Sequence, residues 1–581
     1  MRSIAAATLT AALLTAATEG RAQAQPPSPA PAAPAPAAPP AVEAAPVEKA
    51  PPPASVAAAQ APQPAAEDEW SDRLVIDTGR IELRPPDKHA VRFTLHGEYQ
   101  LRYRGQSDLR LQAPIGDASL DKLGQNQLVT HWLRLNPRFQ FRDNFALVAQ
   151  LDVPTGMVAG DRTQRVDAAR DPMNDPKWYG IKARHLYFEW NTSIGTVRVG
   201  QQGSYWGTGI LANDGDHPTL FGDYTNGAIT ERLLFATQPA GKGTPLTLLF
   251  AGDMVLEDAT ARLLSDRDRA FQGVTAAMWR TKPAELGVYG VVRHAENDRT
   301  STGPLTPFTE SLTVGVVDVT GKFNARVPGA DAFAYGSFEV ASIVGSTNFV
   351  RGNCGRLLDP TKPARDEKVR SFGASATIGA VHVGRDANRR WGKAALEVEW
   401  GYASGDADPC DGTTKRFVMD PNHNVGLVLF RHVMAWKTAR AATIAQDPDL
   451  VGRSAPGVQL LPSNGGIFGA TYLNPRLVVR PRPWLDLKGG VLLAQTTADL
   501  VDPYHAGALG NLRNYDGGSS RLHDLGLEVD LGIEGRIEVP GVVINVGAEG
   551  GALFPGHAFD DAGGHRLPNQ YLGNLRAGLH F

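Results

Sequence analysis

Seven arginines lie in phase along stretches of the chain in which apolar and polar residues alternate. They are expected on the polar side of these stretches: Arg92, Arg102, Arg104, Arg134, Arg138, Arg142 and Arg576. Because a guanidinium group offers a planar pair of donors to a carboxylate, a surface lined by these residues would attract anionic solutes. The alternative is that they only balance acidic residues of the same surface, namely Glu98, Asp152, Glu534 and Glu538.

No motif of a catalytic site accompanies these arginines. The chain contains no Gly-x-Ser-x-Gly, His-Glu-x-x-His or Gly-x-x-x-x-Gly-Lys sequence, and its 14 histidines are scattered. A net charge of −3 also argues against nucleic acid as the main partner. We therefore expect neither an enzyme nor a bound cofactor. The acidic stretches 213–216 and 406–408 offer oxygen ligands for Ca²⁺, but ordinary solvated turns are the favoured interpretation.

The alternation itself predicts the fold. Between residues 91 and 104 every odd position is apolar or glycine and every even position is polar, and residues 525–539 repeat the pattern. A period of two is typical of a β-strand with one apolar face. Strands of this length exceed the roughly 5–6 residues usual in soluble sheets, whereas a tilted strand needs about 9–11 residues to cross a membrane.

Eighteen such stretches fit between residue 91 and Phe581, and short and long connections alternate between them. Outer-membrane barrels of bacteria have short periplasmic turns and long external loops. The sequence thus predicts an all-β fold: a transmembrane, antiparallel, up-and-down barrel of about 18 strands (16–18), formed by residues 91–581.

Aromatic residues are expected at both edges of the lipid-facing band. Tyr571 and Phe581 share one face of the last stretch, about 33 Å apart along a strand and about 25 Å apart in height once the strand is tilted. The same phase rule gives the predicted aromatic girdles: Tyr99, Tyr103, Trp190, Trp400, Tyr402, Tyr571 and Phe581. Trp132 does not fit this phase.

The N-terminal region is expected to precede the barrel in three parts. Residues 1–24 have the short basic start, apolar stretch and Ala-x-Ala ending of a secretory signal peptide. Residues 25–66 are rich in Pro and Ala, which predicts a disordered periplasmic tether with access to peptidoglycan or periplasmic partners. Residues 67–90 form a short lead-in. The expected location is the outer membrane of a Gram-negative cell, in contact with its lipid.

Two resemblances accompany these patterns. The ending QYLGNLRAGLHF (570–581) resembles the C-terminal signal of bacterial outer-membrane proteins, which implies recognition of the last strand by the barrel-assembly machinery. The stretches WGYASGDADP (400–409), NPRLVVRP (474–481) and WLDL (484–487) resemble alginate-export-type barrels. That resemblance implies an eighteen-stranded monomeric barrel whose basic lumen passes an anionic polysaccharide; it transfers no individual residue.

The largest predicted loop and the two cysteines bear on access to the barrel. Residues 406–464 are too many for a simple loop and include apolar runs, so they either fold into the lumen or cap it from outside. Cys354 and Cys410 are the only cysteines, and both fall in predicted external loops. Since disulfides persist outside the cell, we predict a Cys354–Cys410 bond.

Two functional alternatives stand beside that of a channel. The channel would carry small or polymeric, anionic solutes by passive passage or export. The first alternative is a non-conducting barrel that anchors the outer membrane through the tether. The second is a soluble, secreted all-β protein that acts on carbohydrate.

Overall fold

The computed structural model describes residues 91–112, 122–142, 144–162, 180–222, 227–241, 243–258, 260–263, 268–297, 310–348, 366–382, 393–446 and 461–581. The chain divides into two units, Met1–Gln63 and Pro64–Phe581, and only the second contains described residues. The predicted signal peptide, tether and lead-in lie outside the described residues. Among the residues that are described, no helix is long and apolar enough to span a membrane.

Long strands make up most of the described chain. They are β1 (Val91–Gln106), β2 (Gln127–Phe141), β3 (Phe145–Gly160), β4 (Gly180–Asn191), β5 (Thr196–Gly203), β6 (Ile229–Thr237), β7 (Leu246–Glu257), β8 (Arg269–Arg280), β9 (Ala284–Asn297), β10 (Glu310–Arg326), β11 (Ala332–Thr347), β12 (Glu367–His382), β13 (Lys393–Ala403), β15 (Ala470–Arg482), β16 (Leu485–Thr496), β17 (Asp524–Val539), β18 (Val542–Pro555) and β19 (Gln570–His580). A two-residue strand, β14 (Thr413–Thr414), pairs in parallel with β12.

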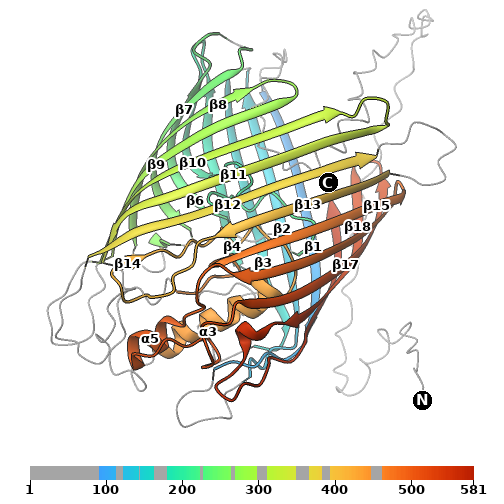
Figure 1. Cartoon of the computed structure of the whole chain (residues 1–581). Coiled ribbons are helices and arrows are strands. Elements are labelled where there is room, and N and C mark those ends of the chain that lie inside the picture. The colour runs from blue at the N-terminus through green and yellow to red at the C-terminus, as the bar shows by residue number, and fades with distance from the viewer. Residues whose placement is uncertain are drawn as a thin grey trace, which may run out of the picture. The chain divides into compact units, whose positions relative to one another are not determined.

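The eighteen long strands close into a ring (Figure 1). Each pairs antiparallel with its neighbour in the chain, from β1 to β19, and β19 pairs with β1. At this seam Tyr99 lies opposite Leu579, and Gly97 and Phe581 exchange two backbone hydrogen bonds of 2.9 Å. A Cβ atom on Gly97 would lie 2.6 Å from the Phe581 ring, so a glycine at this position leaves room for the ring of the terminal residue. The predicted antiparallel barrel of about 18 strands is confirmed.

The two ends of the barrel differ in their connections. Tight turns such as residues 192–195 and 540–541 lie at the end where the chain terminates, and the long loops lie at the other. In the described residues, four short helices belong to the long loops: η4 (Leu429–Met434), α3 (Ala435–Gln446), α5 (Pro503–Leu509) and η6 (His557–Phe559). Figure 1 shows α3 and α5 side by side at the long-loop end, away from the C-terminus.

The pleat of the strands separates two surfaces. Large apolar residues on the outer surface are exposed, for example Leu531 at 64 % and Ile533 at 49 %, while Asp530, which directly precedes Leu531, is fully buried inside. Six of the predicted girdle residues are exposed on this outer surface: Tyr99, Tyr103, Trp190, Trp400, Tyr571 and Phe581. The seventh, Tyr402, is half-buried and contacts Phe372, with ring centroids 5.9 Å apart.

Trp132 faces the interior. It is buried on β2, and the guanidinium of Arg134 lies 4.2 Å from the centre of its ring. Arg102 of β1 lies 5.4 Å from the same ring. The residue that does not fit the outward phase is therefore an inward platform for two arginines.

Candidate pore constriction

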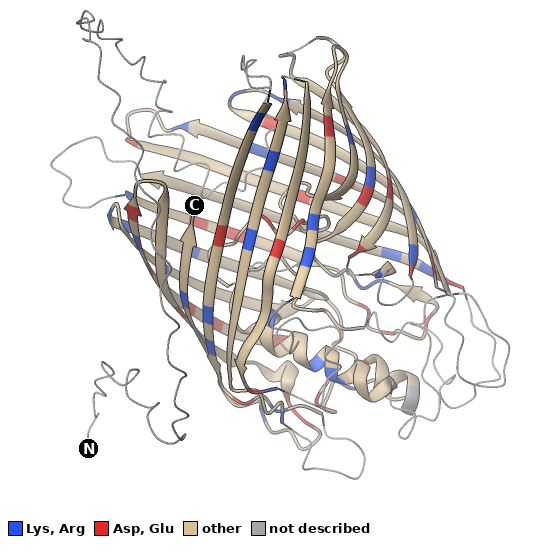
Figure 2. Ribbon diagram, turned by 180° about the vertical axis from the view of Figure 1, so that it is seen from behind, with Lys and Arg blue, Asp and Glu red and all other residues tan. Residues whose placement is uncertain are grey.

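Charged residues of both signs are spread along the strands (Figure 2). Arg134 and Asp152, for example, are buried, unlike the exposed apolar residues of the outer face. Arg134 of β2 forms a two-pronged ion pair with Asp152 of β3, with nitrogen–oxygen distances of 2.7 and 3.1 Å. Its third contact, at 2.5 Å, is with Asp216. Asp216 also accepts from Arg184 at 2.7 Å. Because Asp216 belongs to a loop, Arg134 and Arg184 attach that loop to the barrel wall.

Arg138 is positioned differently from Arg134. It shares the carboxylate of Glu189 with Arg198, at 3.1 and 2.9 Å, and its side chain is 40 % exposed. Two cations thus face one acid at this level of the wall. Arg142 follows the end of β2, in the tight turn, where it is exposed and has a positive φ of 48°. It therefore lies at the rim rather than within the wall.

The remaining predicted arginines lie around the seam between β1 and β19. Arg102 donates to Gln100, and Arg104 donates to Asn574 at 3.1 Å. Arg576 pairs with Glu549 at 2.9 Å. Arg92 is exposed near the start of β1. Most of these arginines have polar or acidic neighbours, as the alternative of balanced charge predicts.

The described residues of the β5–β6 loop (204–222 and 227–228) fold into the barrel. The backbone N–H of Thr208 donates to the Glu339 carboxylate at 2.5 Å, and the Thr208 hydroxyl donates to the same oxygen at 2.9 Å. Trp206 donates from its indole N–H to Asp318 at 3.1 Å. Since Asp318 and Glu339 lie on β10 and β11, this loop crosses to the wall opposite Arg134.

The β13–β15 loop, described at residues 404–446 and 461–469, also enters the barrel with part of its length. The backbone N–H groups of Leu427, Val428 and Leu429 donate to the Glu528 carboxylate at 2.6, 2.7 and 2.7 Å, which satisfies the free donors at the start of η4. His423 contacts Glu399 of β13 at 3.0 Å. The sequence predicts that residues 406–464 either fold into the lumen or cap it from outside. Residues 417–434 fold into the lumen, and α3, which follows them, lies across the mouth.

The two loops contact each other inside the barrel. The backbone N–H of Asp420 donates to the Ile210 carbonyl at 2.8 Å, and the Asn424 amide donates to the Phe221 carbonyl at 3.1 Å. Phe221 packs against a wall glycine: a Cβ atom on Gly490 would lie 2.9 Å from its ring. Together with residues of the strands, the loops form a continuous buried apolar cluster. We call the two inserted loops the constriction.

Several ionisable groups of the loops have shifted pKa values. Burial alone would lower the pKa of His423, but the hydrogen bond and charge of Glu399 outweigh it and leave this pKa raised. Burial, assisted by the charge of Arg104, lowers the pKa of His432 to about 3, so this imidazole is neutral. Burial raises the pKa of Asp420 to about 7.

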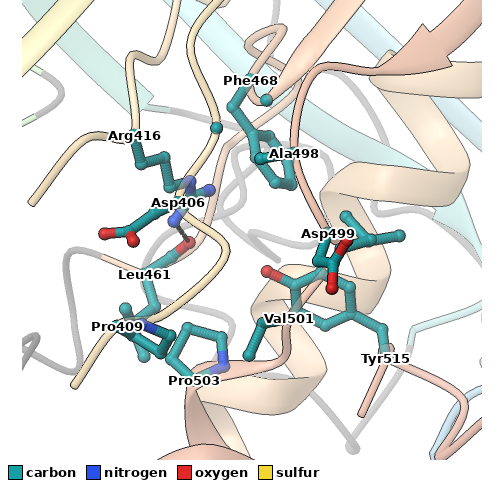
Figure 3. A pocket seen from close by; sticks show the side chains of 13 residues that line it. Asp406, Pro409, Arg416, Leu461, Phe468, Ala498, Asp499, Val501, Pro503 and Tyr515 are labelled. Carbon is teal, nitrogen blue, oxygen red and sulfur yellow. Dashed lines mark hydrogen bonds between the residues drawn. The ribbon is translucent and has the colours of Figure 1, made fainter. Parts of the chain in front are cut away.

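At the mouth of the barrel, an ion pair connects the β13–β15 and β16–β17 loops, and a small pocket lies between them. Lys437 of α3 contacts Asp516 of the β16–β17 loop at 2.6 Å, and both side chains are almost fully buried. The pocket lies beside it, between the β13–β15 and β16–β17 loops (Figure 3). Arg416 crosses this pocket, with its guanidinium 4.0 Å from the Phe468 ring and a bond of 3.0 Å to the Leu461 carbonyl. The pocket therefore lies between two loops, and no described residue of the long strands lines it.

Two predictions about the loops have mixed outcomes. Cys354 lies outside the described residues, so the Cys354–Cys410 disulfide stays a prediction. The carboxylates of residues 214 and 216 are engaged by His217 and by Arg134 and Arg184, which favours ion pairing over Ca²⁺ there. In the described part of the chain, no group of three His, Cys, Asp or Glu side chains is arranged to hold a metal ion.

Sequence patterns did not reveal the acids that hold the constriction. Asp318, Glu339, Glu399 and Glu528 lie on strands whose alternation shows only that they face inward. Glu339 and Glu528 bind backbone N–H groups of distant loops, and a backbone donor carries no signal in the sequence. Asp318 and Glu399 bind the side chains of Trp206 and His423, which belong to the same two loops. The available signal was the apolar character of residues 425–430, which predicted that this loop packs against something.

Comparison with known proteins adds only distant likenesses. No protein-family model and no curated protein matches the chain. Among solved structures, Pseudomonas aeruginosa OccK5 (OpdH) is 8 % identical with a TM-score of 0.42, covering 84 % of this chain and 98 % of that one. Acinetobacter baumannii OccAB1 is 10 % identical with a TM-score of 0.42, covering 84 % of this chain and 97 % of that one. Pseudomonas aeruginosa OpdK with vanillate is 9 % identical with a TM-score of 0.43, covering 84 % of this chain and 98 % of that one. At such low similarity, the assignment of the fold rests on the closed ring of strand pairs described above.

Proposed function

We propose that the chain is an outer-membrane channel that passes small hydrophilic solutes through a lumen narrowed by the constriction. The observation that carries this proposal is the closed ring of eighteen strands with exposed apolar residues outside and charged residues inside. An apolar outer face of this kind is stable in lipid, and closure leaves no strand edge unpaired there. Residues 91–581 would span the outer membrane, with the long loops outside the cell.

Anionic solutes are the class that the wall favours. Arg138 and Arg198 share one carboxylate, Glu189, so this level of the wall carries an excess of positive charge. Arg134 does not contribute in the same way, because Asp152 and Asp216 neutralise it. Export of an anionic polymer, which the resemblance to alginate-export-type barrels implies, would further require both loops to leave the lumen. Passage of small anions is therefore the narrower proposal.

Recording from planar bilayers tests the channel. The protein should conduct, its conductance should rise when residues 406–464 are removed, and Arg138→Gln with Arg198→Gln should reduce its preference for anions. Arg142→Gln, at the rim, is the matched control and should change selectivity less. Unchanged selectivity in the double variant would leave these arginines as ordinary charges of the wall.

A non-conducting anchor is the second candidate, because a buried apolar cluster joins the inserted loops to the strands. No conductance, even after removal of residues 406–464, would favour this role. Recovery as a soluble protein, without a heat-dependent shift in gel migration, would instead contradict the membrane location. Recognition of β19 by the barrel-assembly machinery and binding of the tether to peptidoglycan are proposals that accompany either role.

A further inference from the structure

The constriction is held at two places by pairs of buried carboxyl groups. Asp318 and Glu339 hold the β5–β6 loop, and Glu528 with Asp530 lies against the β13–β15 loop. All four side chains are fully buried, with exposed fractions of 0 %. Within each pair the carboxyl groups are within hydrogen-bonding reach of each other.

Both pairs contain buried oxygens that have no donor among the described residues. These oxygens are Asp318 Oδ2, Glu339 Oε1, Asp530 Oδ1 and Asp530 Oδ2. An ionised carboxylate can only accept hydrogen bonds, so two ionised groups in contact cannot satisfy each other. A proton on one member of each pair supplies the missing donor. It also avoids two like charges side by side in a fully buried site.

The loop backbone lies directly on these pairs. A Cβ atom on Gly426 would be 2.6 Å from Glu528 Oε1 and 3.2 Å from Asp530 Oδ2. A Cβ atom on Gly207 would be 2.4 Å from Glu339 Oε2. Water therefore reaches either pair only if the loop that covers it moves. A second negative charge at either pair would be relieved most readily by such a movement.

We propose that each carboxyl pair shares one proton and that these two protons keep the constriction closed. Loss of a proton leaves two adjacent buried carboxylates, which draws water to the wall and releases the loop. The channel would then open as the pH rises. This inference rests on the proposed function, since it assigns the gate of that channel.

Among the described residues, few other charged groups face the two pairs. Around Glu528 and Asp530, β16 contributes Leu492 and Gly490 in register, and β18 contributes Gly551 with Glu549 nearby. Glu549 is itself paired with Arg576. Its negative charge adds to the repulsion that follows loss of the proton.

Around Asp318 and Glu339, the facing groups are Tyr289 of β9 and His423 of the β13–β15 loop. His423 is bound to Glu399, and its own loss of charge would also weaken the constriction as the pH rises. Asp420 gains a negative charge near neutrality, and this charge would also weaken the constriction as the pH rises. The test must therefore separate the carboxyl pairs from these two residues.

Recording the purified full-length protein in planar bilayers between about pH 8 and about pH 10 makes that separation. The wild-type open probability should rise roughly tenfold over this range, equivalent to about 1.4 kcal/mol. The variant with Asp318→Asn and Asp530→Asn should stay closed throughout. Its amides supply permanent donors and cannot ionise, while His423 and Asp420 are unchanged. Glu296→Gln, which removes an exposed carboxyl, is the control and should respond like the wild type.

A wild-type open probability that does not change with pH would overturn the proposal, as would an unchanged response in the double variant. If the double variant does not assemble, hydrogen exchange of the wild-type amides at residues 427–429 replaces it. These amides should exchange faster at high pH than the intrinsic rate predicts, and exchange that follows the intrinsic rate would contradict the gate. A wild-type barrel that never conducts, even without residues 406–464, would count against the channel itself.

Discussion

At the scale of single residues, Asp420 should make docking of the β13–β15 loop depend on pH. Burial raises its pKa to about 7, so the docked loop binds a proton more tightly than the released loop. Stability of the docked state is then greatest below the ordinary carboxyl pKa of about 4 and falls as the pH rises to about 7. In the wild type the Asn422 N–H donates to Asp420 Oδ1 at 2.8 Å. The variant Asp420→Asn keeps an acceptor for this N–H group and cannot ionise.

This variant should remove that dependence and stabilise docking at neutral pH by roughly 1–3 kcal/mol, since Asp420 is half-buried and solvent screens part of the effect. Protease cleavage of the loop, measured between about pH 4 and about pH 8, reports docking. Asn422→Ala is a useful companion because it removes a hydrogen bond without removing the charge. An equal pH slope in Asp420→Asn and the wild type would show that another group controls this range.

At the scale of elements, the ion pair between Lys437 and Asp516 should fix α3 across the mouth. Both side chains are almost fully buried, so Lys437→Met would leave Asp516 charged without its partner. Breaking a buried pair in this way costs about 3–5 kcal/mol. We expect cleavage of the β13–β15 loop by added protease to become roughly tenfold faster or more, while the heat-dependent gel shift of the barrel stays unchanged.

The double variant Lys437→Met with Asp516→Leu is the matched control, because removing both members of the pair leaves no unpaired charge, although the Arg110 carbonyl loses its bond from Lys437. It should recover most of the resistance to protease. If Lys437→Met alone is as resistant as the wild type, α3 is held by its apolar contacts and the ion pair is incidental.

At the scale of the whole molecule, a new charge should destabilise the barrel much more on its outer face than on its inner face. Ile533 is 49 % exposed on the outer face, and an arginine there would meet lipid near mid-depth. Such a substitution should lower the free energy of unfolding by about 2–4 kcal/mol. Thr377→Arg places the same side chain on the inner face of β12, opposite Glu399 in register, and should be far less destabilising.

Denaturant unfolding in lipid vesicles, followed by tryptophan fluorescence, measures both variants. Equal destabilisation by Ile533→Arg and Thr377→Arg would contradict the assignment of outer and inner faces. It would also remove the main support for a membrane location.

The sequence by itself determined the number of strands, their alternation and the direction of most side chains. A strand has a period of two, so polarity along residues 91–104 or 525–539 reports directly which face each residue occupies. It also showed that residues 406–464 exceed a simple loop. These are local properties, and neighbours in the chain are enough to encode them.

Only the tertiary structure decided which charges are neutralised by close partners and which remain exposed inside the barrel. Arg134 and Arg138 share one face of β2, yet Asp216 neutralises the first and the second remains half open to the lumen. Glu528 binds the backbone N–H groups of residues about a hundred positions earlier in the chain. Such contacts depend on how two loops fold back into a closed ring. Since backbone donors are the same at every residue, composition and periodicity cannot encode which of them an inward carboxylate will bind.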